Sequence, residues 1–216
     1  MSIIKETEII CPNCETRFEC RTYDSINTNK KGALEDIISG NLFKCTCPGC
    51  GETYTLVYPI LFNDMINHVM IHFLPEKEDL EKVDLDFVKA TIGLNYKAYR
   101  IVHNINDLSE KALIFNCGLD DRTIELVKVI ALQNIQDSFP DETISHQRFI
   151  LNSDGKPVIR FFDNNNRSKY DVELSDEQFS LIGKEFGKYY LPDKYSVQVD
   201  TDWAIDILNR YSEDIE

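Results

Sequence analysis

Hydrophobic and polar residues alternate along several short stretches of the first 75 residues. Successive side chains of a β-strand point to opposite faces, so this alternation predicts strands. The predicted strands cover residues 5–10, 17–22, 42–46, 52–61 and 67–74. Residues 33–38 have instead the spacing of a short helix that ends at Gly40, and the polar residues 25–31 predict a turn. The pattern predicts a strand-rich N-terminal unit with a short inserted helix.

The pattern becomes helical in the middle of the chain. After a predicted strand at residues 97–103, a helix is expected from Asn106, with Asp107 as its cap and Gly118 as its end. Asp120 is placed to cap the next helix, in which apolar residues recur on one side. That apolar stripe consists of Ile124, Val127, Ala131 and Ile135.

Beyond Pro140, short strands and helices follow one another. Turn residues predict a hairpin over residues 149–163 and a second turn at residues 164–167. The other predicted elements are a strand at 170–174, a helix at 176–190 capped by Ser175, a strand at 195–199 and a helix at 201–211. The fold class expected for the whole chain is therefore α+β.

Two Cys-x-x-Cys hooks are the strongest chemical signal in the sequence. They are Cys11-Pro12-Asn13-Cys14 and Cys47-Pro48-Gly49-Cys50, with 32 residues between them. Zn²⁺ binds four thiolates at tetrahedral corners, and each hook brings two sulfurs to one ion. The sequence therefore predicts one structural zinc ion held by Cys11, Cys14, Cys47 and Cys50.

Two alternatives to zinc remain open at this point. Iron held by the same four cysteines, as in rubredoxins, is geometrically possible. A dithiol redox role is the other alternative, although a strand-like run follows the first hook rather than the helix of thioredoxin-like sites. Gly51 after the second hook allows a positive φ, whereas Glu15 at the equivalent position predicts mild strain or a different turn.

The residues around the hooks resemble the CpXC domain family. The resemblance includes both hooks, Ser25-Ile26-Asn27, Gly40-Asn41-Leu42-Phe43 and Tyr58-Pro59, and it extends over about residues 8–135. It implies the same four metal ligands and supplies no reaction.

The position of the hooks and two changes in composition along the chain suggest that the protein has three parts. Residues 1–75 are expected to form a zinc-ribbon-like CpXC core, and residues 76–139 an acidic connector followed by helices of the same domain. Residues 140–216 are expected to form a small α+β unit.

The chain has 216 residues, of which 43% are hydrophobic, enough for one core or two modest ones. Its apolar runs are too short for a membrane span, and its N-terminus lacks the basic and apolar regions of a signal peptide. We therefore expect a cytoplasmic protein. In a reducing cytosol the three other cysteines, Cys20, Cys45 and Cys117, are expected to be free thiols, with Cys20 and Cys45 close together.

The net charge of −14 argues against a nucleic-acid partner. Residues 1–75 hold 6 basic and 9 acidic side chains, and the remainder holds 17 and 28. A zinc ribbon that binds nucleic acid normally presents a basic face, because phosphate contacts supply most of the affinity.

The sequence does not predict an enzyme. The nucleotide-binding, zinc-protease and serine-hydrolase motifs are absent from it. His68 and His72 would share one face of a strand without a carboxylate partner, and Asp120-Asp121-Arg122 is explained by helix capping. Cys117 at a helix end is a poor nucleophile, because the helix dipole disfavours a thiolate there.

The leading expectation is a zinc-stabilised interaction or adaptor protein with an unidentified protein partner. The alternatives are a nucleic-acid-associated zinc ribbon and, third, a thiol redox or iron-binding protein.

Overall fold

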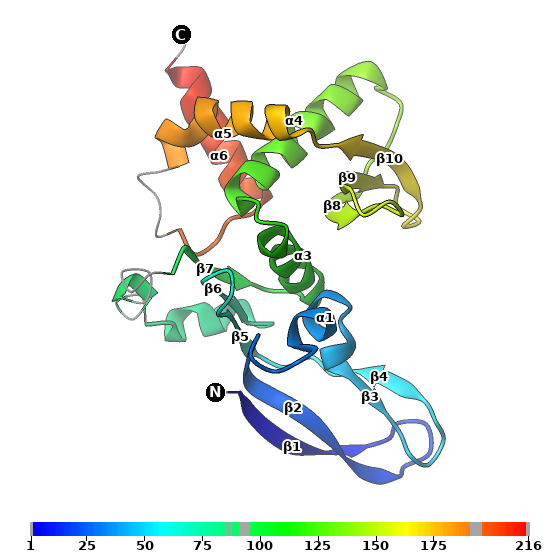
Figure 1. The fold of residues 1–216 in the computed structure, drawn as a ribbon. Helices are drawn as coiled ribbons and strands as arrows, with labels where there is room; N and C mark the ends of the chain where they lie inside the picture. Colours follow the sequence, from blue (N-terminus) through cyan, green and yellow to red (C-terminus); the bar gives the residue numbers. More distant parts are fainter. Residues whose placement is uncertain (1, 85, 87, 91–95, 191–195, 215–216) are drawn as a thin grey trace. The chain divides into compact units, whose positions relative to one another are not determined.

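The computed structural model describes residues 2–84, 86, 88–90, 96–190 and 196–214 of the chain (Figure 1). It contains both helices and strands, which confirms the predicted α+β class. The chain divides into two compact units, Met1–Ala112 and Leu113–Glu216. The sequence-based boundaries at residues 75 and 139 stay a prediction. None of the described helices combines the length and the apolar character that a membrane crossing requires.

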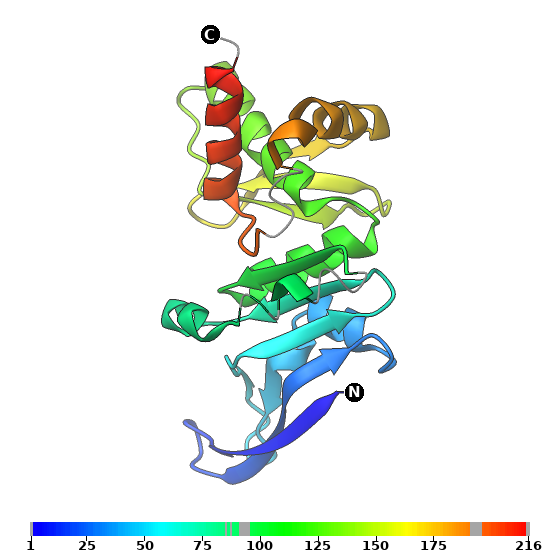
Figure 2. The ribbon, with the colours of Figure 1, turned by 90° about the vertical axis from the view of Figure 1, so that its left-hand side faces the viewer.

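A five-stranded sheet forms the centre of the first unit. Its strands, in spatial order, are β1 (Ile3–Ile10), β2 (Arg17–Asn27), β5 (Ile60–Asp64), β6 (Val69–Phe73) and β7 (Ala98–Val102). Figure 2 shows this order from blue β1 to green β7. The pairs β1–β2 and β5–β6 are antiparallel, whereas β2–β5 and β6–β7 are parallel.

Several shorter elements accompany this sheet in the described part of the first unit. They are α1 (Ala33–Ile38), the 3₁₀ helices η1 (Asn41–Phe43) and η2 (Lys77–Lys82), and a separate hairpin of β3 (Lys44–Thr46) and β4 (Thr53–Thr55). The boundary between the two units falls within α3 (Ile105–Asn116).

The core of the first unit follows from strand alternation. Along β5 and β6, every second residue is buried, as the pleat requires. Phe43 from η1 packs edge-to-face on Phe73, with ring centroids 5.6 Å apart. The Ser109 hydroxyl of α3 donates to the carbonyl oxygen of Ile37, which ties α3 to α1 at 2.8 Å.

Several local predictions in this unit were wrong. Residues 25–27 continue β2 rather than turning, because they pair in parallel with residues 61–63. Residues 41–43 form a 3₁₀ helix, and the strand predicted at 52–61 is broken between Thr55 and Ile60. The helix α3 is capped not by Asp107 but by Asn104, whose Oδ1 accepts the Asp107 amide at 2.8 Å.

The second unit packs helices on one face of an antiparallel sheet. The sheet has the order β10 (Ser168–Glu173), β9 (Pro157–Phe162) and β8 (His146–Leu151). The helices are α4 (Asp121–Ser138), α5 (Asp176–Tyr190) and α6 (Thr201–Glu213). Val127, Ala131 and Ile135 of α4 pack with Ile159 and Phe161 of β9, as the predicted apolar stripe requires.

Helix caps in the second unit were largely predicted. Asp120 caps α4 by accepting the Arg122 amide at 3.0 Å, and its carboxylate also binds the Arg122 guanidinium. Ser175 Oγ accepts the Gln178 amide at the start of α5. The cap of α6 is Asp200, one residue before the predicted start. The strand predicted at 195–199 was wrong for residues 196–199, and residue 195 lies outside the described residues.

Candidate metal centre

The two cysteine hooks are the turns of two β-hairpins. Cys11 to Cys14 lie between β1 and β2, and Cys47 to Cys50 lie between β3 and β4. Both turns have the same hydrogen bonds. The Cys11 amide donates to Thr16 O at 3.0 Å, and the Cys47 amide donates to Glu52 O at 2.8 Å. The chain therefore builds the same turn twice.

The residue after each hook has a left-handed backbone. Gly51 has φ 76°, and Glu15 at the equivalent position has φ 59°. The amide of each donates to the first cysteine of its own hook at 2.9 Å. Glu15 was expected to be mildly strained or to form a different turn. The structure supports the first alternative: the two hooks have the same turn, and the left-handed backbone strains Glu15 because a side chain disfavours this conformation.

The two hairpins bring four sulfur atoms into one cluster. The Sγ atoms of Cys11, Cys14, Cys47 and Cys50 all lie within 4.8 Å of one another. Two of the distances between the hairpins, Cys11 Sγ to Cys50 Sγ and Cys14 Sγ to Cys47 Sγ, are both 3.6 Å. Bonds of about 2.3 Å to a tetrahedral zinc ion would place the sulfurs about 3.8 Å apart. The donor set and its spacing therefore fit a metal ion.

Tyr54 is part of the site, and sequence reasoning missed it. This β4 residue places its Oη 3.2 Å from Cys11 Sγ. Burial disfavours the Cys11 thiolate, but the Tyr54 hydrogen bond and the Cys14 and Asn13 amides outweigh it and lower the Cys11 pKa to about 6. The thiolate in turn raises the pKa of Tyr54, because it accepts a hydrogen bond from the phenol O–H and so favours the neutral phenol. The signal available in the sequence was strand alternation, which places Tyr54 on one face of its strand. The structure pairs Tyr54 with Cys45 on the neighbouring strand.

The other cysteines of the cluster have different surroundings. Burial raises the pKa of Cys47 to about 11, although its sulfur accepts the Gly49 amide at 3.3 Å. The side chain and amide of Thr16 lower the pKa of Cys14. Cys11 and Cys47 are buried, whereas Cys14 and Cys50 are exposed. A metal ion would therefore be held at the edge of the hairpin pair.

Gly49 is required by close packing between the hooks. A Cβ atom at this position would lie 2.3 Å from Thr16 Oγ1 and 3.3 Å from Cys14 Sγ. Real Cβ atoms do not approach other atoms as closely as the first distance. A side chain at the third residue of the second hook would therefore require Thr16 to shift, whereas Asn13 at the equivalent position is exposed.

The expectation that Cys20 and Cys45 are free thiols was wrong. They form a disulfide with a Cα–Cα distance of 6.1 Å. The bond confirms that the two cysteines lie close together, as expected. Cys20 lies on β2 and Cys45 on β3, so the disulfide links the two hairpins that carry the hooks. Cys117 is a free thiol, and burial raises its pKa.

The other residues considered in the sequence lie outside the cluster. His72 Nδ1 is 2.9 Å from Tyr99 Oη, and His103 Nδ1 is 2.8 Å from Leu74 O. His68 is not on the strand face expected but lies in the turn before β6, with φ 57°. Asp120 and Arg122 serve the cap of α4. Among the described residues, a group able to hold a metal is found at the four cysteines.

The cluster lies within the part of the chain that matches a known family. The family model described as CpXC protein matches residues 9–128. No match to the chain was found among curated proteins or among solved structures. The matched segment contains both hooks, the end of β1, β2 to β7 and α3, and it covers more than half of the 216 residues. The chain therefore belongs to the CpXC family.

Proposed function

We propose that Cys11, Cys14, Cys47 and Cys50 bind one structural Zn²⁺ ion, and that the protein is a non-catalytic, cytoplasmic binding protein. The observation that carries the zinc site is the approach of four sulfurs from two hairpins to within 4.8 Å of one another. Thiolates are ligands that zinc prefers, and the paired hooks have the spacing of structural zinc sites.

The ligand set supports a structural role rather than a catalytic one. Catalytic zinc sites keep one position for water or substrate, whereas four thiolates fill the tetrahedron. The four free cysteines of the cluster lie in the turns of two hairpins, and the β3–β4 hairpin has strands of only three residues each. Metal binding then supplies folding free energy to this region.

Elemental analysis of the purified full chain tests the site. One zinc per chain in a colourless sample is expected, with loss of hairpin structure when a chelator is added. The variant Cys50→Ser should lose the metal, whereas Cys117→Ser, which removes a thiol outside the cluster, should keep it. Iron with a red colour would replace the zinc proposal, and full metal content in Cys50→Ser would refute the ligand assignment.

The proposed partner is a protein rather than a nucleic acid. This proposal is supported by the net charge of −14 and by the absence of a basic excess in residues 1–75, which carry the site. Proteins recovered from native lysate with the wild type but not with Cys50→Ser would identify a metal-dependent partner. Retention of the chain on DNA or RNA at low salt, lost at higher salt, would instead favour the nucleic-acid alternative.

A further inference from the structure

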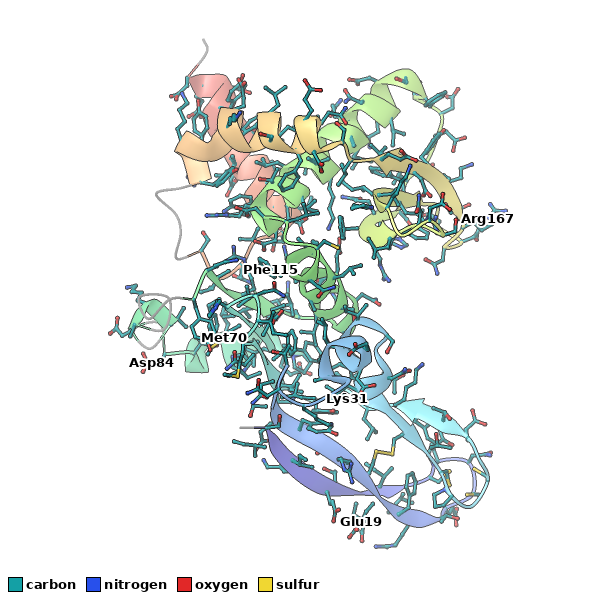
Figure 3. The ribbon with its side chains drawn as sticks, in the orientation of Figure 1. Glu19, Lys31, Met70, Asp84, Phe115 and Arg167 are labelled. Atoms are coloured by element: carbon teal, nitrogen blue, oxygen red, sulfur yellow. A yellow bond between two sulfur atoms is a disulfide. The ribbon has the colours of Figure 1, made fainter. Side chains whose placement is uncertain are left out.

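The two hairpins that carry the hooks are held together through cysteine sulfur. They belong to different sheets, and no strand ladder joins them in the described part of the chain. The sulfur cluster connects their turns, and the Tyr54 hydroxyl of one hairpin contacts Cys11 of the other. The Cys20–Cys45 disulfide adds a covalent link behind the turns, visible as a yellow bond between β2 and the β3–β4 hairpin in Figure 3.

The disulfide and the cluster are neighbours on the same strands. Cys45 pairs directly with Tyr54 across the β3–β4 ladder, so their side chains share one face. Tyr54 reaches Cys11 from that face, and Cys45 reaches Cys20. Both links therefore oppose the same movement, the separation of the two hairpins.

Because the disulfide is buried, its reduction depends on the separation of the two hairpins. Cys20 is 8% exposed and Cys45 is 5% exposed. A thiol reagent must reach one of these sulfurs in line with the S–S bond, so the hairpins must first move apart. A metal ion bound at the turns opposes that opening.

We propose that Cys20 and Cys45 are a reversible thiol–disulfide site whose oxidation state sets how firmly the neighbouring cluster holds its metal. This inference rests on the proposed metal binding. The oxidant class is a small-molecule disulfide such as glutathione disulfide, and the reductant is the corresponding thiol.

The reaction balances through a mixed disulfide. One of the two protein thiolates attacks the S–S bond of glutathione disulfide and expels one glutathione thiolate. The second protein thiolate then attacks the protein sulfur of the mixed disulfide and expels the other. Two protein thiols and one glutathione disulfide become one protein disulfide and two glutathione thiols, and reduction is the reverse.

Metal binding and oxidation reinforce each other by thermodynamic linkage. The disulfide keeps the two hooks close in the metal-free chain, so less conformational freedom is lost when the metal binds. By reciprocity, the bound metal stabilises the disulfide against reduction by the same factor. Oxidised protein should therefore hold zinc more tightly, and zinc should shift the thiol–disulfide equilibrium toward the disulfide by the same factor. Because bound zinc also opposes the separation of the hairpins that reduction requires, zinc-loaded protein should be reduced more slowly.

Zinc transfer to a chromophoric chelator tests the proposal on the full chain. Zinc-loaded protein is equilibrated with glutathione disulfide or with a phosphine reductant, and peptide mapping verifies the state of Cys20 and Cys45. We expect zinc affinity at least tenfold higher in the oxidised protein. Cys20→Ser/Cys45→Ser should show the affinity of the reduced protein under both conditions, whereas Cys117→Ser should behave as the wild type.

The outcomes separate the two proposals. Equal zinc affinity in verified oxidised and reduced wild type would overturn the redox inference and leave the zinc site intact. Failure of both forms to bind stoichiometric zinc would refute the metal proposal itself. The wild-type comparison decides the matter even if the double variant does not fold. Reduction of the disulfide at the same rate with and without zinc would also contradict the inference.

Discussion

At the scale of single residues, the site depends on positions outside the four cysteines. Glu15, Thr16, Gly49 and Tyr54 determine the backbone of the turns, their packing and the charge of the sulfurs. The cysteines were predicted because Cys-x-x-Cys spacing is a local signal. Tyr54 was not, because its contact with Cys11 depends on how two separate hairpins pack.

Adding a side chain at position 49 should weaken metal binding. We expect Gly49→Ala to raise the zinc dissociation constant by about 10- to 100-fold, the usual effect of disturbing residues around metal ligands. The reason is the 2.3 Å approach of the new Cβ to Thr16 Oγ1. Chelator competition measures the constant.

The matched control is Asn13→Ala in the first hook, which should leave the affinity unchanged because Asn13 is exposed. Thr16→Ala should partly rescue Gly49→Ala, because contacts of 3.1 and 3.3 Å remain after the hydroxyl is removed. No effect of Gly49→Ala would show that the hooks are further apart in solution.

Replacing Glu15 with glycine should stabilise the first hairpin. A left-handed backbone costs a residue with a side chain about 1–2 kcal/mol, and glycine would relieve this strain. Glycine loses more conformational entropy on folding, which offsets about 0.5–1 kcal/mol of that gain. We expect Glu15→Gly to raise the free energy of unfolding of the first unit by about 0.5–1 kcal/mol in saturating zinc. Urea unfolding followed by circular dichroism measures it, and Gly51→Ala should have the opposite sign.

At the scale of elements, the sequence predicted the helices and hairpins whose formation depends on residues close together in the chain. The hairpin at residues 149–163 and the helices α1, α4 and α5 were predicted, because their turns, caps and apolar stripes lie within a few residues. Residues 25–27 were not, because their parallel pairing with residues 61–63 overrides a polar local sequence. The 3₁₀ helix at residues 41–43 replaced a strand for a similar reason: Phe43 is placed by its packing on Phe73.

The turn between β9 and β10 should make the second unit sensitive to acid. The amide and side chain of Arg167 lower the pKa of Asp163 from its ordinary value of 3.8. A lowered pKa in the folded state gives stability that is present above pH 3.8 and is lost as the pH falls through the folded pKa. Asp163→Asn should therefore destabilise the second unit at neutral pH, and destabilise it less as the pH falls.

Fluorescence of Trp203, the single tryptophan of the chain, reports this loss, because it lies in the second unit. Asp154→Asn, in the exposed β8–β9 turn, is the control and should be silent at both pH values. A pH-independent cost for Asp163→Asn would contradict the assigned role of its charge.

At the scale of the whole molecule, the metal centre belongs to one of two compact units. Its four ligands lie in Met1–Ala112, and the Trp203 environment lies in Leu113–Glu216. The sequence could not predict this division, since the boundary falls inside a helix and has no Pro, Gly or charge signal.

Chelation should therefore act on the first unit alone. We expect backbone amides of β1 to β4 to lose protection from hydrogen exchange when zinc is removed, whereas those of α4 and β9 keep it. Trp203 fluorescence should stay constant in the same sample. Loss of protection throughout the chain would show that the two units fold as one.

The end of the family match at residue 128 has a consequence for where the chain can be shortened. Residue 128 lies inside α4, and the helix continues to Ser138 with Ala131 and Ile135 packed on β9. A gene segment cut there would encode half a helix whose apolar side has lost its cover. The matched segment therefore does not coincide with a folding unit. A shortened chain of this kind would need another apolar surface to cover the remaining part of α4.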